Sequence, residues 1–89
     1  MAYYKATPRL ISFKVHCEKK GMRLLNDDLQ FIDRMLDKID SAHFKPVLER
    51  YVEKWCDTLT QYENVQQAMN LARRTANLWL MECADSMKR

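Results

Sequence analysis

Glycine and proline are the residues that most constrain the fold of this chain, because it contains so few of them. Among 89 residues there are one glycine and two prolines. A β-sandwich or β-barrel turns back on itself about every 8–12 residues and usually builds those turns on such residues. Their scarcity predicts few, long elements, and it favours helices over strands.

The length of the chain fits a single domain over residues 1–89, built around one core. Apolar residues make up 47% of the chain and charged residues 30%, which is typical of a globular protein and unlike a disordered one. We expect residues 1–7 to form a loose N-terminal arm. The predicted fold is all-α: a small bundle of three or four helices with short connections.

Two patterns in the middle of the chain predict amphipathic helices. Over residues 27–40, apolar side chains recur every three or four positions, namely Leu29, Ile32, Met35, Leu36 and Ile39. Asp27 and Gln30 fit a capping box at its start. Asp33, Asp37 and Asp40 share the opposite face, which we interpret as solvated. The next helix begins near Pro46 and continues to about Tyr62.

The last helix is predicted from about Val65 to near Met87, with Asn64 and Gln67 as its capping pair. Its main apolar seam is predicted to consist of Val65, Met69, Ala72, Ala76, Trp79 and Cys83. A second line on the same helix comprises Leu71, Thr75 and Leu78. Two apolar lines indicate either the central helix of the fold or a helix shared with another molecule.

Residues 8–21 are ambiguous between a strand and a helix. As a strand, the segment would alternate apolar and polar side chains, but the chain has no second strand to pair with it, so the pairing would require a twin subunit. As a helix, it would start at Pro8 and stop at Gly21. We favour the helix. It would gather four cations, the basic arc of Arg9, Lys19, Lys20 and Arg23.

The charge of the chain is unevenly distributed. Residues 1–26 carry a net charge of +5, residues 27–63 a net of −4 and residues 64–89 a net of +2, for a total of +3. The basic N-terminal part is suited to attracting an anionic partner, or it is neutralised by the acidic middle within the fold. Sequence leaves both interpretations open.

No arrangement of residues indicates catalysis. His16 and His43 are the only histidines, no C-x-x-C or H-x-x-x-H spacing occurs, and a single glycine cannot build a phosphate-binding loop. The three cysteines are widely spaced, as expected for reduced thiols. We therefore predict no enzymatic activity, no metal site and no cofactor.

The sequence also predicts the compartment. No apolar run approaches the roughly 18 residues of a membrane span, and the N-terminus lacks the apolar core of a secretion signal. We expect a cytoplasmic protein that does not associate with membranes.

These patterns favour a small, non-enzymatic regulator or adaptor that binds another protein. Leu71, Arg74 and Leu78 are the predicted contact residues, and the basic arc would hold an acidic surface of the partner. Homodimerisation is an open variant of this prediction. The alternative is a nucleic-acid-binding regulator that uses the same basic arc, either as a helix or as a dimer of the ribbon-helix-helix kind.

Overall fold

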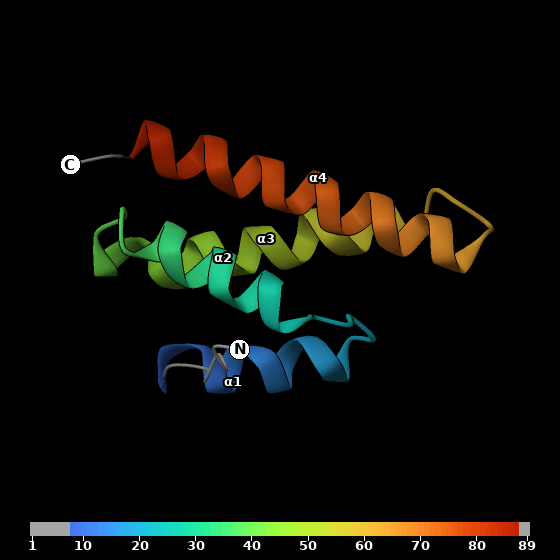
Figure 1. Cartoon of the computed structure of the whole chain (residues 1–89), viewed down its shortest axis with the longest axis horizontal. Helices are drawn as coiled ribbons and strands as arrows, with labels where there is room; N and C mark the ends of the chain where they lie inside the picture. Colours follow the sequence, from blue (N-terminus) through green and yellow to red (C-terminus); the bar gives the residue numbers. More distant parts are fainter. Residues whose placement is uncertain (1–7, 88–89) are drawn as a thin grey trace.

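The computed structural model describes residues 8–87, and all regular elements in this part of the chain are helices, without a strand. Its elements are, in order, α1 (Pro8–Lys19), α2 (Asn26–Leu36), the short 3₁₀ helix η1 (Ser41–His43), α3 (Phe44–Leu59) and α4 (Val65–Ser86) (Figure 1). The prediction of a small all-α bundle is confirmed, and residues 8–19 are helical. The predicted arm, residues 1–7, lies outside the described residues.

The end of α1 explains why this segment is a helix. Gly21 adopts a φ of 80°, a left-handed conformation that only glycine enters without strain. The amide of Met22 donates to the carbonyl of Cys17 at 3.0 Å, and the amide of Gly21 donates to that of Glu18 at 3.1 Å. These two bonds form a Schellman motif, which satisfies the last carbonyls of the helix and buries Met22.

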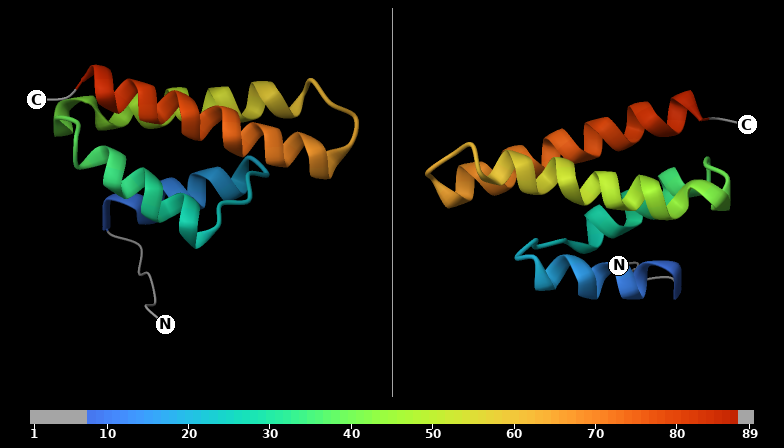
Figure 2. Two further views of the ribbon diagram at one scale, coloured as in Figure 1. Left: turned by 45° about the horizontal axis from the view of Figure 1, so that its top comes forward. Right: turned by 180° about the vertical axis from the view of Figure 1, so that it is seen from behind.

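Consecutive helices run in alternating directions. In Figure 1, α4 lies at the top and α1 at the bottom, with α3 between them, and the right-hand view of Figure 2 shows the same order from behind. The α3–α4 hairpin has the most extensive contact in the fold, and α2 packs across it against α4. No helix within residues 8–87 is long and apolar enough to cross a membrane.

Two contacts define the register of the α3–α4 hairpin. The hydroxyl of Tyr51 donates to Oδ1 of Asn77 at 2.5 Å, and one turn further along α3 the guanidinium of Arg73 lies 5.4 Å from the ring centroid of Trp55. Moving four residues forward on α3 therefore moves four residues back on α4. The two helices are antiparallel and in phase over this stretch.

The buried seam of α4 differs from the predicted one. The structure buries a line of small residues at four-residue intervals, completed by one leucine: Ala68, Ala72, Ala76, Leu80 and Ala84. Val65 is 72% exposed, so its placement in the seam was wrong. Helices that cross at close range pack along rows of residues spaced by four, and alanines there let the backbones approach. Of the predicted seam, Ala72 and Ala76 belong to this buried row, whereas its three-residue steps led away from the row at both ends.

The cysteines lie at different depths in this bundle. Cys17 is fully buried, whereas Cys56 and Cys83 are half-buried, and all three are free thiols. Burial, and next the neighbouring Cys56 and Glu18, raise the pKa of Cys17 to about 12. Its thiol is therefore protonated at neutral pH and packs as a small apolar group beside Phe13 of the same helix, which is also buried.

Candidate functional site

The three predicted contact residues lie together on the outer side of α4. Leu78 is 50% exposed, Arg74 is exposed and Leu71 is half-buried. All three line a shallow hollow of about 360 Å³. Leu78 is thus not a core residue, and we call these three residues the α4 surface.

A larger groove lies beside the α4 surface, between α2 and α4. It encloses about 510 Å³ and shares Arg74 and Leu78 with the hollow. Its apolar lining consists of Phe31 from α2 together with Leu78 and Met81 from α4. Sequence reasoning missed Met81, although its position three residues after Leu78 places both on one helix face.

The polar lining of this α2–α4 groove contains two arginines with different roles. Nε of Arg73 donates to Oδ2 of Asp28 at 2.9 Å, and its Nη2 donates to the backbone oxygen of Arg23 at 3.0 Å. Arg74, in contrast, makes no ion pair with any residue between 8 and 87. Arg73 is therefore a fixed part of the groove, and Arg74 is the cation available to a partner.

Asp28 anchors this arrangement from inside the fold. It is only 4% exposed, and besides Arg73 it accepts from the amide of Leu25 at 2.9 Å and from Nδ2 of Asn77 at 3.4 Å. Burial, and next the charge of Asp28, raise the pKa of Tyr51, so its hydroxyl stays protonated and donates to Asn77. The groove residues Arg73 and Asn77 are thus held by buried partners.

Sequence reasoning assigned the start of α2 to the wrong residues. It paired Asp27 with Gln30, whereas in the structure Leu25 precedes the helix and Asp28 caps its amide. No role was predicted for Asp28 from the sequence. One feature of the sequence could have identified Asp28. It stands three residues after the N-cap Leu25, where a carboxylate can accept a hydrogen bond from the amide of the N-cap residue.

The predicted basic arc is divided in the structure. Arg9 donates through Nε to Oδ1 of Asp33 and through Nη2 to Oδ1 of Asp37, both at 2.7 Å, and it lies 5.3 Å from the ring of Phe44. The interpretation of this face as solvated was therefore wrong for Asp33, whose side chain is 18% exposed, whereas Asp37 and Asp40 are exposed as predicted. For Arg9, the acidic middle of the chain neutralises the basic N-terminal part.

The other three cations of the arc remain at the surface. Lys19, Lys20 and Arg23 are exposed, and none of their side chains has an ion pair within the described part of the chain. They occupy the end of α1 and the turn after it. Because the backbone oxygen of Arg23 accepts from Arg73, this turn adjoins the α2–α4 groove.

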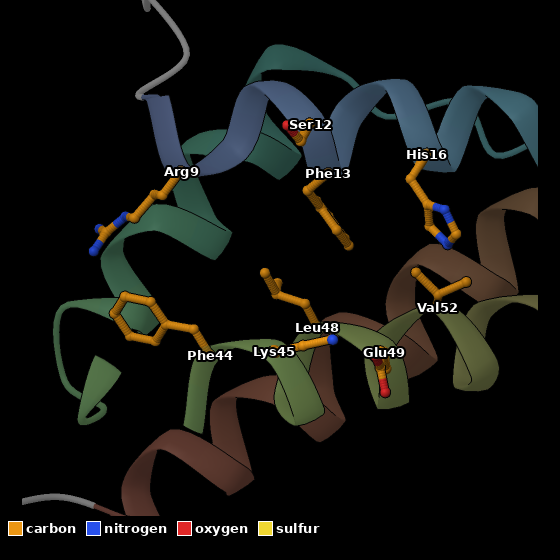
Figure 3. Close-up of a pocket in the computed structure, with 9 residues that line it drawn as sticks. All are labelled: Arg9, Ser12, Phe13, His16, Phe44, Lys45, Leu48, Glu49 and Val52. Carbon is orange, nitrogen blue, oxygen red and sulfur yellow. The ribbon is translucent and has the colours of Figure 1, made fainter. Parts of the chain in front are cut away.

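A second groove, which sequence reasoning did not identify, runs between α1 and α3 and encloses about 450 Å³ (Figure 3). Phe13 points from α1 towards Leu48 of α3, and His16 points towards Val52. Lys45 and Glu49 also line it, both from α3, so its rim carries both signs of charge.

No cluster of three or more histidine, cysteine, aspartate or glutamate side chains within residues 8–87 is arranged to hold a metal ion. The α2–α4 groove and the adjoining α4 surface combine exposed apolar side chains with an arginine, Arg74, that has no ion pair within residues 8–87. The floor of this groove is held in place by hydrogen bonds to buried side chains. Comparisons with protein-family models, with curated proteins and with solved structures found no match to this chain.

Proposed function

We propose that this chain is a small cytoplasmic, non-enzymatic regulator or adaptor that binds another protein through the α4 surface and the adjoining α2–α4 groove. The observation that carries the proposal is the 50% exposure of Leu78 in the middle of a helix whose opposite side already packs in the core. The contribution of α4 to the buried core comes from its alanine row and Leu80, and Leu78 is not part of that core.

The neighbours of Leu78 support the same conclusion. Met81 is 40% exposed, and Phe31 and Leu71 are half-buried around it, so the exposed apolar groups are clustered. Clusters of this kind beside a hollow are typical of protein contacts, where a few central side chains provide most of the binding energy. Burying the exposed half of one leucine contributes about 1 kcal/mol.

The substitution Leu78→Asp tests this proposal. The variant is expected to keep the helical circular dichroism of the wild type, because the side chain is outside the core, and to weaken partner binding at least about thirty-fold. The measurement is affinity capture from a native lysate with quantitative mass spectrometry. If the partner is a second copy of this chain, Leu78→Asp would convert a dimer to a monomer, and light scattering after size exclusion measures that change.

Ile11→Asp is the matched control, because Ile11 is 54% exposed but lies on α1, outside the groove. It is expected to retain the partners, or the dimer, of the wild type. Equal binding by the two aspartate variants would show that the α4 surface is not the contact. Unfolding of Leu78→Asp alone would mean that the leucine has a structural role, which also contradicts the proposal.

The exposed end of α1 supports a second candidate function, nucleic-acid binding through Lys19, Lys20 and Arg23. Three phosphate contacts predict that log K falls with log salt concentration with a slope of about −2 to −3. The double variant Lys19→Glu/Lys20→Glu is expected to remove this binding in an anisotropy titration against mixed DNA and RNA. Binding that this double variant leaves unchanged, or no binding at low salt, would reject the candidate.

A further inference from the structure

We infer that the α2–α4 groove recognises an acidic segment of its partner, in which a carboxylate lies next to apolar side chains. The inference rests on the proposed function and specifies the chemistry of the partner. It assigns the apolar contact to Phe31, Leu78 and Met81, and the choice of charge to Arg74.

The charge of the groove supports an anionic partner. Its lining includes two arginines and two asparagines but no acidic side chain. Asp28 already neutralises Arg73, so the charge of that arginine is satisfied within the fold. The charge of Arg74 has no such counterpart within residues 8–87, and the exposed Arg23 adjoins the same groove. A partner that brought a cation here would meet an uncompensated positive charge.

The spacing along α4 defines the pattern that such a segment must match. Arg74, Leu78 and Met81 follow one another at intervals of four and three residues, so they share one face over about 10 Å of helix. An amphipathic partner segment with an acidic residue followed by apolar residues over about two helical turns can contact all three at once.

The rigidity of the groove favours selection of one such pattern. Arg73 is held by Asp28, by the backbone of Arg23 and by the face of Trp55, and Asn77 is held by Tyr51 and Asp28. These polar groups do not reorganise when a partner arrives, which lowers the entropic cost of binding. Arg74, which has no such restraint, is the specificity-determining residue.

The test is selection of random 12-residue peptides displayed on phage against the immobilised full chain. Peptides that lose binding to Leu78→Asp are synthesised and titrated by fluorescence anisotropy. They are expected to be enriched in aspartate or glutamate beside apolar residues. Arg74→Glu should weaken them about ten-fold and Arg74→Lys much less, because a rim charge sets electrostatic complementarity.

Lys45→Glu is the matched control, since it makes the same change of net charge in an exposed residue of the other groove. It is expected to change affinity less than about two-fold, because exposed charges more than a Debye length of ~8 Å apart are largely screened at physiological salt. Replacing the acidic residue of a peptide by lysine should restore its binding to Arg74→Glu.

The two proposals fail in different ways. Peptides that depend on Leu78 but show no acidic enrichment, or that respond equally to Arg74→Glu and Lys45→Glu, would overturn the inference and leave the proposed function standing. If no selected peptide depends on Leu78, both are wrong.

Discussion

Replacing Asp28 by alanine is expected to lower the free energy of unfolding by about 2–4 kcal/mol, because the substitution removes a buried carboxylate and leaves the half-buried Arg73 without its counter-charge. Asp28 is 4% exposed and accepts hydrogen bonds from Arg73, Asn77 and the amide of Leu25. A domain of this size is stable by only about 5–15 kcal/mol. Urea denaturation followed by circular dichroism measures the loss.

Asp27→Ala is the control, since Asp27 is an exposed carboxylate in the same first turn of α2. Its expected cost is at most about 1 kcal/mol, from the lost interaction with the helix dipole. The double variant Asp28→Ala/Arg73→Met should recover part of the Asp28→Ala loss, because it removes both charges of the pair. Equal costs for Asp27→Ala and Asp28→Ala would show that the buried pair does not stabilise the bundle.

Replacing Trp55 by alanine is expected to lower the free energy of unfolding by about 3–5 kcal/mol, the usual range for a buried large aromatic residue. Trp55 is fully buried in the α3–α4 hairpin, with the ring of Tyr51 at 6.2 Å and the guanidinium of Arg73 at 5.4 Å. The alanines of α4 cannot fill the cavity left by the indole, because a methyl side chain cannot reach into it. The same urea titration measures this loss.

The variant Trp55→Phe distinguishes the contribution of ring packing from the cost of the unpaired indole N–H. The indole Nε1 is buried and has no hydrogen-bond partner among the described residues, which is itself unfavourable. Phenylalanine keeps an aromatic ring and removes that N–H, so Trp55→Phe is expected to cost clearly less than Trp55→Ala. Tyr62→Ala, at an aromatic residue that is 42% exposed, should change stability by about 0.5 kcal/mol or less. A Trp55→Phe variant as unstable as Trp55→Ala would contradict this account.

These two variants also bear on the proposed docking site. Arg73 lies between Asp28 and Trp55, and its other side lines the α2–α4 groove. A folded Asp28→Ala protein at low temperature is therefore expected to bind selected peptides more weakly than wild type, even though Asp28 is not part of the lining. The base of the groove and the core of the bundle depend on the same buried contacts.

The part of the candidate site that sequence reasoning identified is the part that depends on helix periodicity. Once α4 is a helix, Leu71, Arg74 and Leu78 fall on one side of it whatever the rest of the chain does. The sequence did not determine whether these residues are exposed, because the same two leucines would be buried if α4 were the central helix of the fold. Met81 and Phe31 complete the groove only because α2 crosses α4 at this height.

The amino-acid sequence by itself determined that the chain is helical, and it determined the start of α4 and the end of α1. These depend on hydrogen bonds between near neighbours, such as the 3.0 Å bond from the amide of Gln67 to Oδ1 of Asn64 that caps α4, and the left-handed Gly21 that ends α1. Such contacts are written in a few consecutive residues and can be recognised there.

Only the tertiary structure decided which charges remain available and which row of α4 is buried. Arg9 is paired with Asp33 across 24 positions of sequence, and Asp28 with Arg73 across 45. Contacts at these separations follow from how the helices cross, and the crossing in turn depends on where small side chains let two backbones approach. A charge or an alanine looks the same in sequence whether it faces solvent or another helix, so its role is settled only when the helices pack.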